Sequence, residues 1–480
     1  MDPLPPAEST GLIGRLDALY EYDREPVTKK DLHGWKIFWA TFAGEHIAGT
    51  EFVIGPLFVM HGCTALAVLL GLLIGNFLAV LSWAFICTPI AVKERLTVYW
   101  QIRKLGGPWL SVAYSSVYGI TLCLLAGSML RVSMTSIALP FAHWFGANGD
   151  VPQSVWIILA VVVGSVIAIL AVLGFEGMAV FSKMSAPWMI SVFLISALVT
   201  LPLLGCHSPA DFWRIATTRI WTGATSIDPS TGHPFSKYTI WHVIGFSWLC
   251  NAPQHFGMAD LTIMRYARKW QMGFCSSIGM YLGHYCAWVA SGILCAAAIM
   301  QGIATDPGPI AYLGAGLTGA LCVVVAGWNV ASPTLYRAGL ALQVVTPNWR
   351  RWLVTMVVGV GMIICACIPA ILAHLDLLIT TNALLLVPLG GFIFADFWLM
   401  PMLGLTTSYA TIKHSLLSLP AAAAWIIAMI GSLAAFFGGA NPIFMVLPEW
   451  VASVVLYTLF SMLQQKMARA SAVEASAPAR

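Results

Sequence analysis

Long apolar runs recur along this chain from residue 34 onward, and short polar segments separate them. A helix that crosses a bilayer needs about 20 consecutive, predominantly apolar residues. Counting apolar windows of that length, we expect about twelve transmembrane helices. Their predicted ranges are 34–61, 63–91, 108–139, 153–175, 182–204, 238–263, 272–301, 310–334, 352–374, 381–402, 416–437 and 442–464.

The composition agrees with this pattern. Of the 480 residues, 59% are hydrophobic and 9% are charged, and the mean hydropathy is +0.83. Soluble domains carry about 25% charged residues, so the chain is predicted to be an all-α polytopic membrane protein that has the lipid bilayer as its partner. Membrane topology accounts for the formal net charge of +4, and we expect no nucleic-acid partner.

The basic residues predict the orientation. With the N-terminus inside, all of the 24 Lys and Arg fall on cytoplasmic segments except Arg131, Arg214, Arg219 and Lys237. Cytoplasmic loops carry an excess of these residues. Both termini are therefore predicted to be cytoplasmic, in a multi-pass protein of the cytoplasmic (inner) membrane. We see no cleavable signal before the first span, so the spans themselves would direct insertion.

The first predicted span carries Glu45, His46 and Glu51 within an apolar run, together with Gly44 and Gly49. A carboxylate at bilayer depth is costly unless it faces protein, water or a partner, so these residues are functional candidates. The glycines favour a break in the helix, which is tolerated at that depth where the freed backbone lines a cavity. We predict a discontinuous helix beside a solute site. The alternative is a packing helix whose acids are neutralised by neighbours.

The sixth predicted span has Asn251, Pro253, Gln254 and His255 inside another apolar run. Proline removes a backbone donor and collides with the preceding turn, so the helix should kink or break there. Interrupted spans at corresponding places in two halves of a chain point to the midplane site of a secondary transporter. The alternative is an ordinary proline kink.

Five motifs in this order resemble segments of the nucleobase–cation symporter-1 family, whose members are permeases for purines, cytosine, hydantoins, allantoin and some vitamin bases. The motifs are LLIGN at 72–76, the basic loop at 88–109, ADLTIMRYARK at 259–269, GWNVASPTLYRAG at 327–339 and PLGGFIFADFWL at 388–399.

The resemblance implies a LeuT-type fold with two inverted five-helix repeats and two additional helices. The corresponding division of the chain is a cytoplasmic tail (1–33), a first repeat (34–204), an external loop (205–237), a second repeat (238–402), two additional helices (403–466) and a second cytoplasmic tail (467–480).

The resemblance also implies a site in which a flat heterocycle lies between aromatic rings of spans three and six. Trp248 matches the aromatic residue of span six, and Asn329 matches an amide of span eight. Tyr118 is the counterpart in span three, although Tyr114 is also available.

These residue types suit such a ligand on chemical grounds as well. Aromatic faces hold planar rings by stacking and apolar burial. An amide offers both donors and an acceptor to a ring edge. Asn251 and Gln254 could add to that edge. We therefore predict that the chain imports a small nitrogen heterocycle by cation symport and alternating access.

The coupling ion is predicted to be a proton rather than sodium. Sodium-coupled members of the family use hydroxyl groups of span eight, whereas this chain has Val323, Val324 and Val325 before Asn329. Valine offers no oxygen beyond its carbonyl. A buried carboxylate can instead bind a proton on one side of the membrane and release it on the other.

Glu45 and Glu51 are the candidate proton carriers, with His46 as a proton-sensitive neighbour. Glu51 and Arg131 lie at a similar predicted depth, so we expect them to form a structural ion pair and leave Glu45 as the unpaired, working carboxylate. Alternatively, Glu45 binds a positively charged or donor-rich substrate directly. Asp260 is expected to form gate or loop contacts near the inner end of span six.

Another kind of permease, an intramembrane enzyme and a channel are the alternatives to import of a heterocycle. A LeuT-type permease for an amino acid or an organic cation is the alternative within transport. An intramembrane enzyme would need a nucleophile with its base or a metal cluster, and the sequence has no HExxH, GxSxG or histidine box. We expect no enzymatic activity and no cofactor. A channel would conduct without saturation. The sequence is compatible with a monomer but does not give the oligomeric state.

Overall fold

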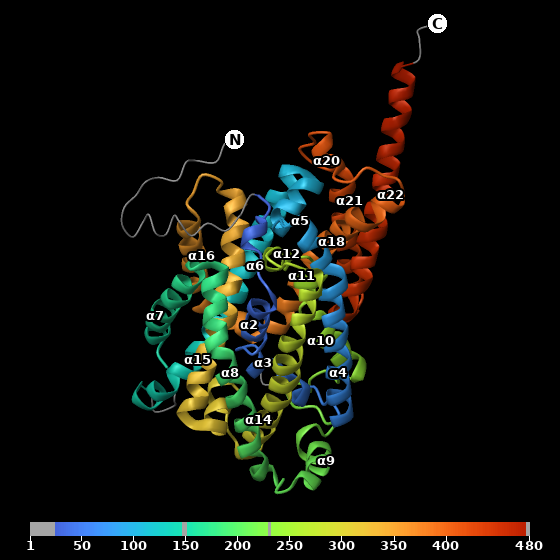
Figure 1. Cartoon of the computed structure of the whole chain (residues 1–480). Coiled ribbons are helices and arrows are strands. Elements are labelled where there is room, and N and C mark those ends of the chain that lie inside the picture. The colour runs from blue at the N-terminus through green and yellow to red at the C-terminus, as the bar shows by residue number, and fades with distance from the viewer. Residues whose placement is uncertain (1–24, 146–150, 229–231, 477–480) are drawn as a thin grey trace, which may run out of the picture.

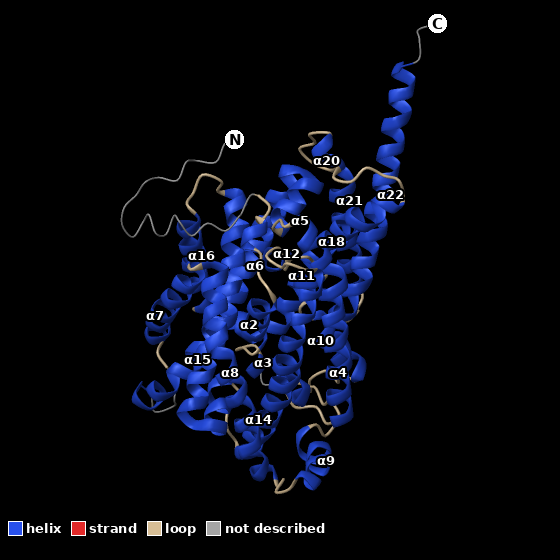
Figure 2. Ribbon diagram, viewed as in Figure 1, coloured by secondary structure: helices blue, strands red, loops and turns tan. Residues whose placement is uncertain are grey.

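The computed structural model describes residues 25–145, 151–228 and 232–476. Residues 1–24 and 477–480, which belong to the two predicted tails, lie outside the described residues. Within the described ranges the regular elements are helices, and strand-type pairing is limited to three isolated β-bridges (Figure 2). The predicted all-α fold class is confirmed.

Helices occupy each of the twelve predicted ranges. Those that define the bundle are α2 (Trp35–His46), α3 (Glu51–Met60), α4 (Ala65–Ser82), α6 (Val98–Phe145), α7 (Gln153–Val172), α8 (Gly174–Thr200), α10 (Ile240–Leu249), α14 (Trp288–Gln301), α15 (Pro307–Val345), α16 (Arg351–Ala366), α18 (Leu375–Phe394), α21 (Leu419–Phe437) and α22 (Pro442–Ser476). Nine helical stretches of the described chain are long and apolar enough to cross a membrane, and α3, α10 and α16 are shorter apolar helices. The chain is built as a multi-pass membrane protein, and the count of twelve spans stays a prediction.

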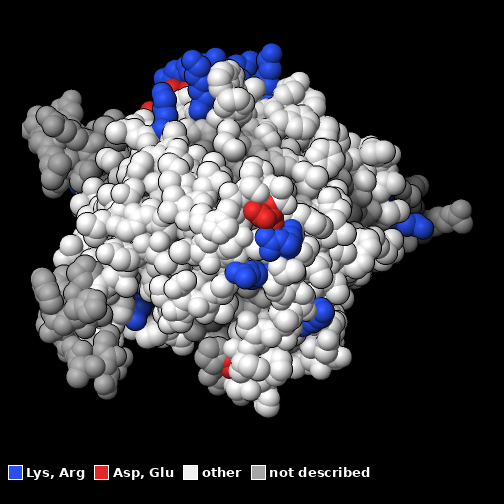
Figure 3. All heavy atoms as spheres, turned by 90° about the horizontal axis from the view of Figure 1, so that it is seen from below, with Lys and Arg blue, Asp and Glu red and all other residues white. Residues whose placement is uncertain are grey.

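The two ends of the bundle differ. In Figure 1, α5 (Thr88–Glu94) and the C-terminal end of α22 lie at the upper end, and the segment around α9 (Phe212–Ile215) lies at the lower end. Seen from below, the lower face is mostly free of charged side chains (Figure 3). The external loop predicted at 205–237 includes α9, so the lower end is the predicted outer side of the membrane, and this orientation stays a prediction.

The first span is broken where glycine and polar residues were expected to break it. Helix α2 ends at His46, Ile47 has φ −106° and ψ 78°, and α3 begins at Glu51. The gap fits between neighbouring helices because glycine lies on both sides of the contact: a Cβ on Gly49 would come within 3.1 Å of the Gly327 Cα in α15. The predicted discontinuous helix is confirmed.

The sixth span is broken as well. Helix α10 ends at Leu249, and a four-residue helix, α11 (Ala252–His255), follows with proline in its first turn. Met258 then adopts a left-handed conformation with φ 63°, and α12 (Leu261–Met264) starts after Asp260. A proline at the start of a helix is tolerated because its missing N–H would have no partner there. Pro253 therefore restarts the helix after the break.

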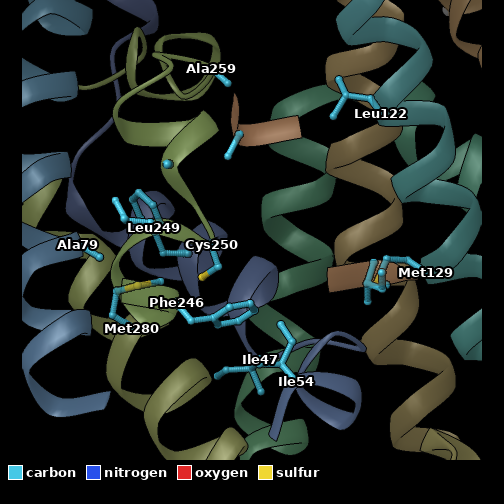
Figure 4. Close-up of a cluster of buried hydrophobic side chains, with 14 of the residues drawn as sticks. Ile47, Ile54, Ala79, Leu122, Met129, Phe246, Leu249, Cys250, Ala259 and Met280 are labelled. Carbon is cyan, nitrogen blue, oxygen red and sulfur yellow. The ribbon is translucent and has the colours of Figure 1, made fainter. Parts of the chain in front are cut away.

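The core of the bundle surrounds these two breaks. Helices α6 and α15 form the most extensive contact in the structure, and α10 packs against α4. Figure 4 shows Ile47 and Ile54 from the first broken span beside Phe246, with Leu249 and Cys250 farther along the sixth. In a bilayer such side chains associate by van der Waals packing, and this packing leaves the polar groups of the breaks enclosed in protein.

The upper ends of the two broken spans are connected by a short parallel pairing. His33, just before α2, forms a β-bridge with Ala267, which follows α12. The His33 N–H donates to the Tyr266 carbonyl at 2.7 Å, and the Arg268 N–H donates to the His33 carbonyl at 3.2 Å. We call this pairing the strap.

Candidate functional site

A cavity of about 80 Å³ lies between the two broken spans and helices α6, α15 and α18. A buried water needs roughly 10–15 Å³ by this measure, so the cavity has room for several waters. Ile54 and Cys250, both labelled in Figure 4, form part of its apolar wall. Its polar residues include Glu45, His46, Asn251, Gln254, Arg337 and Asn382.

Three charged side chains meet beside this cavity: Arg337 and Asp260 are buried, and Glu45 is partly buried. Nη2 of Arg337, on α15, lies 3.1 and 3.0 Å from the two carboxylate oxygens of Glu45 and 2.8 Å from Oδ1 of Asp260. We call these residues the triad. Nε1 of Trp83 donates to the other Asp260 oxygen at 2.7 Å. Buried charges are tolerated when they are paired and hydrogen-bonded, as Asp260 is here.

The triad corrects two predictions. Glu45 is not an unpaired carboxylate, because Arg337 contacts both of its oxygens. Asp260 is not confined to gate or loop contacts, because it is buried and hydrogen-bonded to Trp83 and Arg337. The triad therefore joins α2, the segment after α11, and α15 around one guanidinium.

Amide and imidazole groups form the rest of the polar lining. Nδ2 of Asn251 lies 3.4 Å from Nε2 of His284, which belongs to the π-helix η7 (Gly279–Ala287). The His46 and His284 rings are 5.0 Å apart, and the His46 Nδ1 lies 2.9 Å from the Phe42 carbonyl. A cavity lined by amides and imidazoles can donate to and accept from one small polar molecule.

The predicted site residues divide into two groups. Glu45, His46, Asn251 and Gln254 lie together in the cavity lining. Trp248 does not: its Nε1 donates to Ser82 at 3.0 Å, and its ring packs on Phe256 at a centroid distance of 5.9 Å.

Tyr118 and Asn329 also lie outside the cavity lining. Tyr118 is buried with its ring 5.5 Å from that of Tyr114. The amide of Asn329 is already bonded: its oxygen accepts from Ser182 and Ser185 of α8 at 3.1 and 3.2 Å. Its nitrogen donates to the Val325 carbonyl at 3.2 Å. The two serine contacts hold α15 against α8.

The predicted ion pair between Glu51 and Arg131 is wrong. Among the described residues the structure contains no salt bridge between them. The Glu51 carboxylate accepts hydrogen bonds from Nε1 of Trp288 and, at 2.9 Å, from the Thr50 hydroxyl. The Arg131 guanidinium lies 3.6 Å from the ring centroid of Trp156. Although the two side chains were predicted to lie at a similar depth in the membrane, they point toward different neighbours.

Arg337, Asn382 of α18 and His284 of η7 are cavity residues that the sequence analysis missed, and Arg337 is the charged one among them. The eighth span was predicted to end at residue 334, which assigned Arg337 to a cytoplasmic loop, whereas α15 continues to Val345 and buries it. The apolar run after Arg337 was the available signal, because a helix that continues beyond a lone arginine places it within the bundle.

The part of α15 that would contribute to a sodium site, around Val324, is also packed. The Ser133 hydroxyl donates to the Val324 carbonyl at 3.0 Å, so this oxygen of α15 already has a partner. No group of three or more His, Cys, Asp or Glu that could hold a metal ion occurs in the part of the chain that the structure describes.

Comparison with known proteins gives a consistent fold. No protein-family model and no curated protein sequence matches this chain. Among solved structures, it is similar to Mhp1, a nucleobase-cation-symport-1 family transporter, in a closed conformation with bromovinylhydantoin bound: the TM-score is 0.68 at 14% identity, over 93% of this chain and 96% of that chain.

Two further solved structures share the arrangement. A substrate-bound, outward-open Na⁺-coupled sialic acid symporter matches with a TM-score of 0.63 at 14% identity, over 94% of this chain and 95% of that chain. MhsT in complex with L-phenylalanine matches with a TM-score of 0.52 at 15% identity, over 88% and 97%. The LeuT-type fold that the sequence resemblance implied is confirmed.

Proposed function

We propose that this chain is a secondary active transporter of the cytoplasmic membrane, related to the nucleobase–cation symporters, that imports a small nitrogen heterocycle by alternating access. The observation that carries the proposal is the polar cavity enclosed between two broken helices. Broken spans place helix ends and free backbone groups around a substrate at the bilayer midplane. The similarity to Mhp1 and to the sialic acid symporter supports cation symport.

The cavity supports a small polar ring as the substrate. Asn251, Gln254 and Asn382 line it with amides, which can match alternating donors and acceptors on a ring edge. The imidazole rings of His46 and His284 border the cavity in place of Trp248 and Tyr118. Nucleobases, hydantoins, allantoin and vitamin bases have this combination of a flat face and a polar edge.

A proton is the proposed coupling ion. Glu45 borders the cavity and can change its charge when the site is exposed to either side of the membrane. The valines of α15 and the engaged Val324 carbonyl offer little to a sodium ion, which prefers several free oxygen ligands.

One observation favours a second candidate, a permease for an organic cation or an amino acid. The triad holds two carboxylates against one guanidinium, so its formal charge is −1 when all three groups are ionised. The C-terminal ends of α2 and α10 add partial negative charge beside the breaks. A positively charged substrate group would be attracted to this region.

Uptake into proteoliposomes tests these proposals. We would offer a panel of nucleobases, hydantoins, vitamin bases, amino acids and organic cations with an inside-alkaline pH gradient, a sodium gradient or no gradient. Saturable uptake of one heterocycle driven by the pH gradient is the expected result. Uptake of amino acids or organic cations alone would establish the second candidate. Uptake that follows sodium would overturn the choice of ion, and conductance without saturation would overturn the transporter class.

A further inference from the structure

The two carboxylates of the triad are held very differently. Asp260 does not line the cavity, its side chain is 2% exposed, and Trp83 of the neighbouring π-helix η2 (Trp83–Cys87) occupies its second oxygen. Glu45 lines the cavity, its side chain is 11% exposed, and Arg337 provides its hydrogen bonds. Asp260 is thus the fixed partner of Arg337, and Glu45 is the partner that a solute or a proton can reach.

Arg337 itself has a fixed position. Its backbone carbonyl accepts a hydrogen bond from the Tyr99 hydroxyl at 2.7 Å, which ties this turn of α15 to α6. Both oxygens of Glu45 contact the same guanidinium nitrogen, Nη2, and that nitrogen also donates to Asp260. Nε of Arg337 is buried without a hydrogen-bond partner in the described residues. The ionic contact between α2 and α15 therefore depends on one nitrogen that two carboxylates share.

Besides Arg337, two titratable groups interact electrostatically with Glu45, namely Asp260 and Tyr118 of α6. Two others line the same cavity, namely His46 on the same helix and His284 of η7. His46 already contacts the Phe42 carbonyl, and Tyr118 is buried outside the cavity lining. Glu45 is therefore the acidic group of this cluster that combines cavity access with a charged contact between two helices.

We propose that Glu45 and Arg337 form a proton-operated latch between the first broken span and α15. When Glu45 is ionised, the ion pair holds α2 against α15. A proton from the cavity binds one Glu45 oxygen, removes the charge and weakens the hold on Nη2, while Asp260 keeps Arg337 in place. The proton leaves by the same carboxyl group when the cavity opens to the other side. This proposal rests on the transport function above, and it assigns the step at which a proton changes the conformation.

The test uses a reporter that needs no substrate. Cys250 lines the cavity beside the latch, so its alkylation by N-ethylmaleimide, followed by peptide mass spectrometry, reports opening of the cavity. We would compare the full-length protein and Glu45→Gln between pH 5.5 and pH 8.5 in proteoliposomes. The ratio of the two rates at each pH cancels the reactivity of the thiol itself.

The latch predicts a ratio that depends on pH. Glu45→Gln, which mimics the protonated state, should be alkylated about fivefold or more faster than the wild type at pH 8.5, the lower end of typical coupling between two sites, and equally fast at pH 5.5. The matched control is Asp396→Asn. Asp396 is another buried carboxylate, accepts hydrogen bonds from the Ser408 N–H and the Tyr457 hydroxyl, and lies outside the cavity lining, so this variant should follow the wild type at every pH. Equal rates for the wild type and Glu45→Gln at every pH would overturn the latch.

A second measurement covers the case in which Glu45→Gln does not fold. In the wild type, the ratio of the Cys250 rate to the rate of Cys286, a partly exposed cysteine outside the cavity lining, should rise about fivefold or more as the pH falls from 8.5 to 5.5. A ratio that does not change with pH would overturn the latch. Since alkylation requires no substrate, a failed latch and a failed uptake panel are separate results.

Discussion

Two carboxylates lie on either side of one helix break, and their hydrogen-bond partners and exposure differ. Glu45, in the last turn of α2, contacts the guanidinium of Arg337 and borders the cavity. Glu51, the first residue of α3, is fully buried and accepts hydrogen bonds from Trp288 and Thr50. The same side chain, six positions apart, meets a charge in one case and neutral donors in the other.

Burial alone therefore does not identify the carboxylate that carries protons. Glu51 lies at the N-terminus of α3, where the helix dipole favours negative charge, and its carbonyl accepts from Ser291 at 2.7 Å. The contacts with Trp288 and Ser291 fasten the start of α3 to α14, and Glu51 itself is not among the residues that line the cavity. Glu45 has both cavity access and an ionic partner that can be lost. The following variants test this contrast, in decreasing order of the change that each should cause.

Removal of the cation on the Glu45 side should have the largest effect. Arg337→Gln leaves Glu45 and Asp260 buried without a counter-ion, which costs roughly 3–5 kcal/mol when one partner of a buried pair is removed. We expect a strongly lowered midpoint of thermal unfolding in detergent and loss of uptake. The control is Arg131→Gln, which removes only a contact over Trp156 worth about 0.5–2 kcal/mol. Equal midpoints for the two variants would show that the triad is not ionic.

Truncation on the Glu51 side should have an intermediate effect on stability. Glu51→Ala leaves the buried Trp288 N–H without its acceptor, at a cost of about 1–3 kcal/mol. Glu51→Gln keeps an acceptor and should recover most of the unfolding midpoint. The pH dependence of uptake should persist in Glu51→Gln. If it disappears there and persists in Glu45→Gln, the roles of the two acids are reversed.

The same contrast between cavity-facing and packed groups separates Gln254 from Trp248. Gln254→Ala removes an amide of the lining and should raise KM about tenfold, which corresponds to about 1.4 kcal/mol of lost binding. Trp248→Phe removes a hydrogen bond to Ser82 outside the cavity and should leave KM nearly unchanged. Both values come from initial rates of uptake of the substrate found in the panel. A large increase in KM for Trp248→Phe alone would restore the aromatic site implied by the family resemblance.

The exposed acid Asp211 should have the smallest effect. Hydrogen bonds from Arg214 and Ser208 lower the pKa of its carboxyl to about 2. A carboxyl group whose pKa is lowered in the folded state stabilises the fold at pH values above its unfolded pKa near 3.8. This stabilisation is lost as the pH falls through about 2. Asp211 therefore stays ionised between pH 5 and pH 8, and Asp211→Asn should leave the pH profile of uptake unchanged. A changed profile would place part of the pH response outside the bundle.

The sequence predicted the helix breaks because their causes are local. Glycines beside Glu45 and Glu51, and Pro253 beside Asn251, disrupt helix geometry wherever they stand in an apolar run. The apolar runs likewise gave the positions of the helices. The cavity residues on the broken spans, such as Gln254, followed from these breaks.

The partners of the buried charges could not be predicted in the same way. Depth along the membrane normal was used to pair Glu51 with Arg131, but depth does not give the rotation of each helix about its axis. Arg337 was missed for a different reason: a few residues of error at the end of a span moved it from the core to a loop. Trp248 fitted the expected residue type, yet the turn of α10 that carries it faces Ser82.

The strap between His33 and Ala267 has a mechanical consequence. Main-chain hydrogen bonds join the start of α2 to the end of the sixth span at the upper end in Figure 1. The strap therefore fixes one end of α2, and α2 can turn about that end while Asp260 stays on Arg337. We expect a disulfide formed by His33→Cys with Ala267→Cys to leave uptake intact, and inhibition that dithiothreitol reverses would show that the two segments move independently. Intact uptake would mean that the start of α2 and the end of the sixth span stay joined at this end of the bundle during transport.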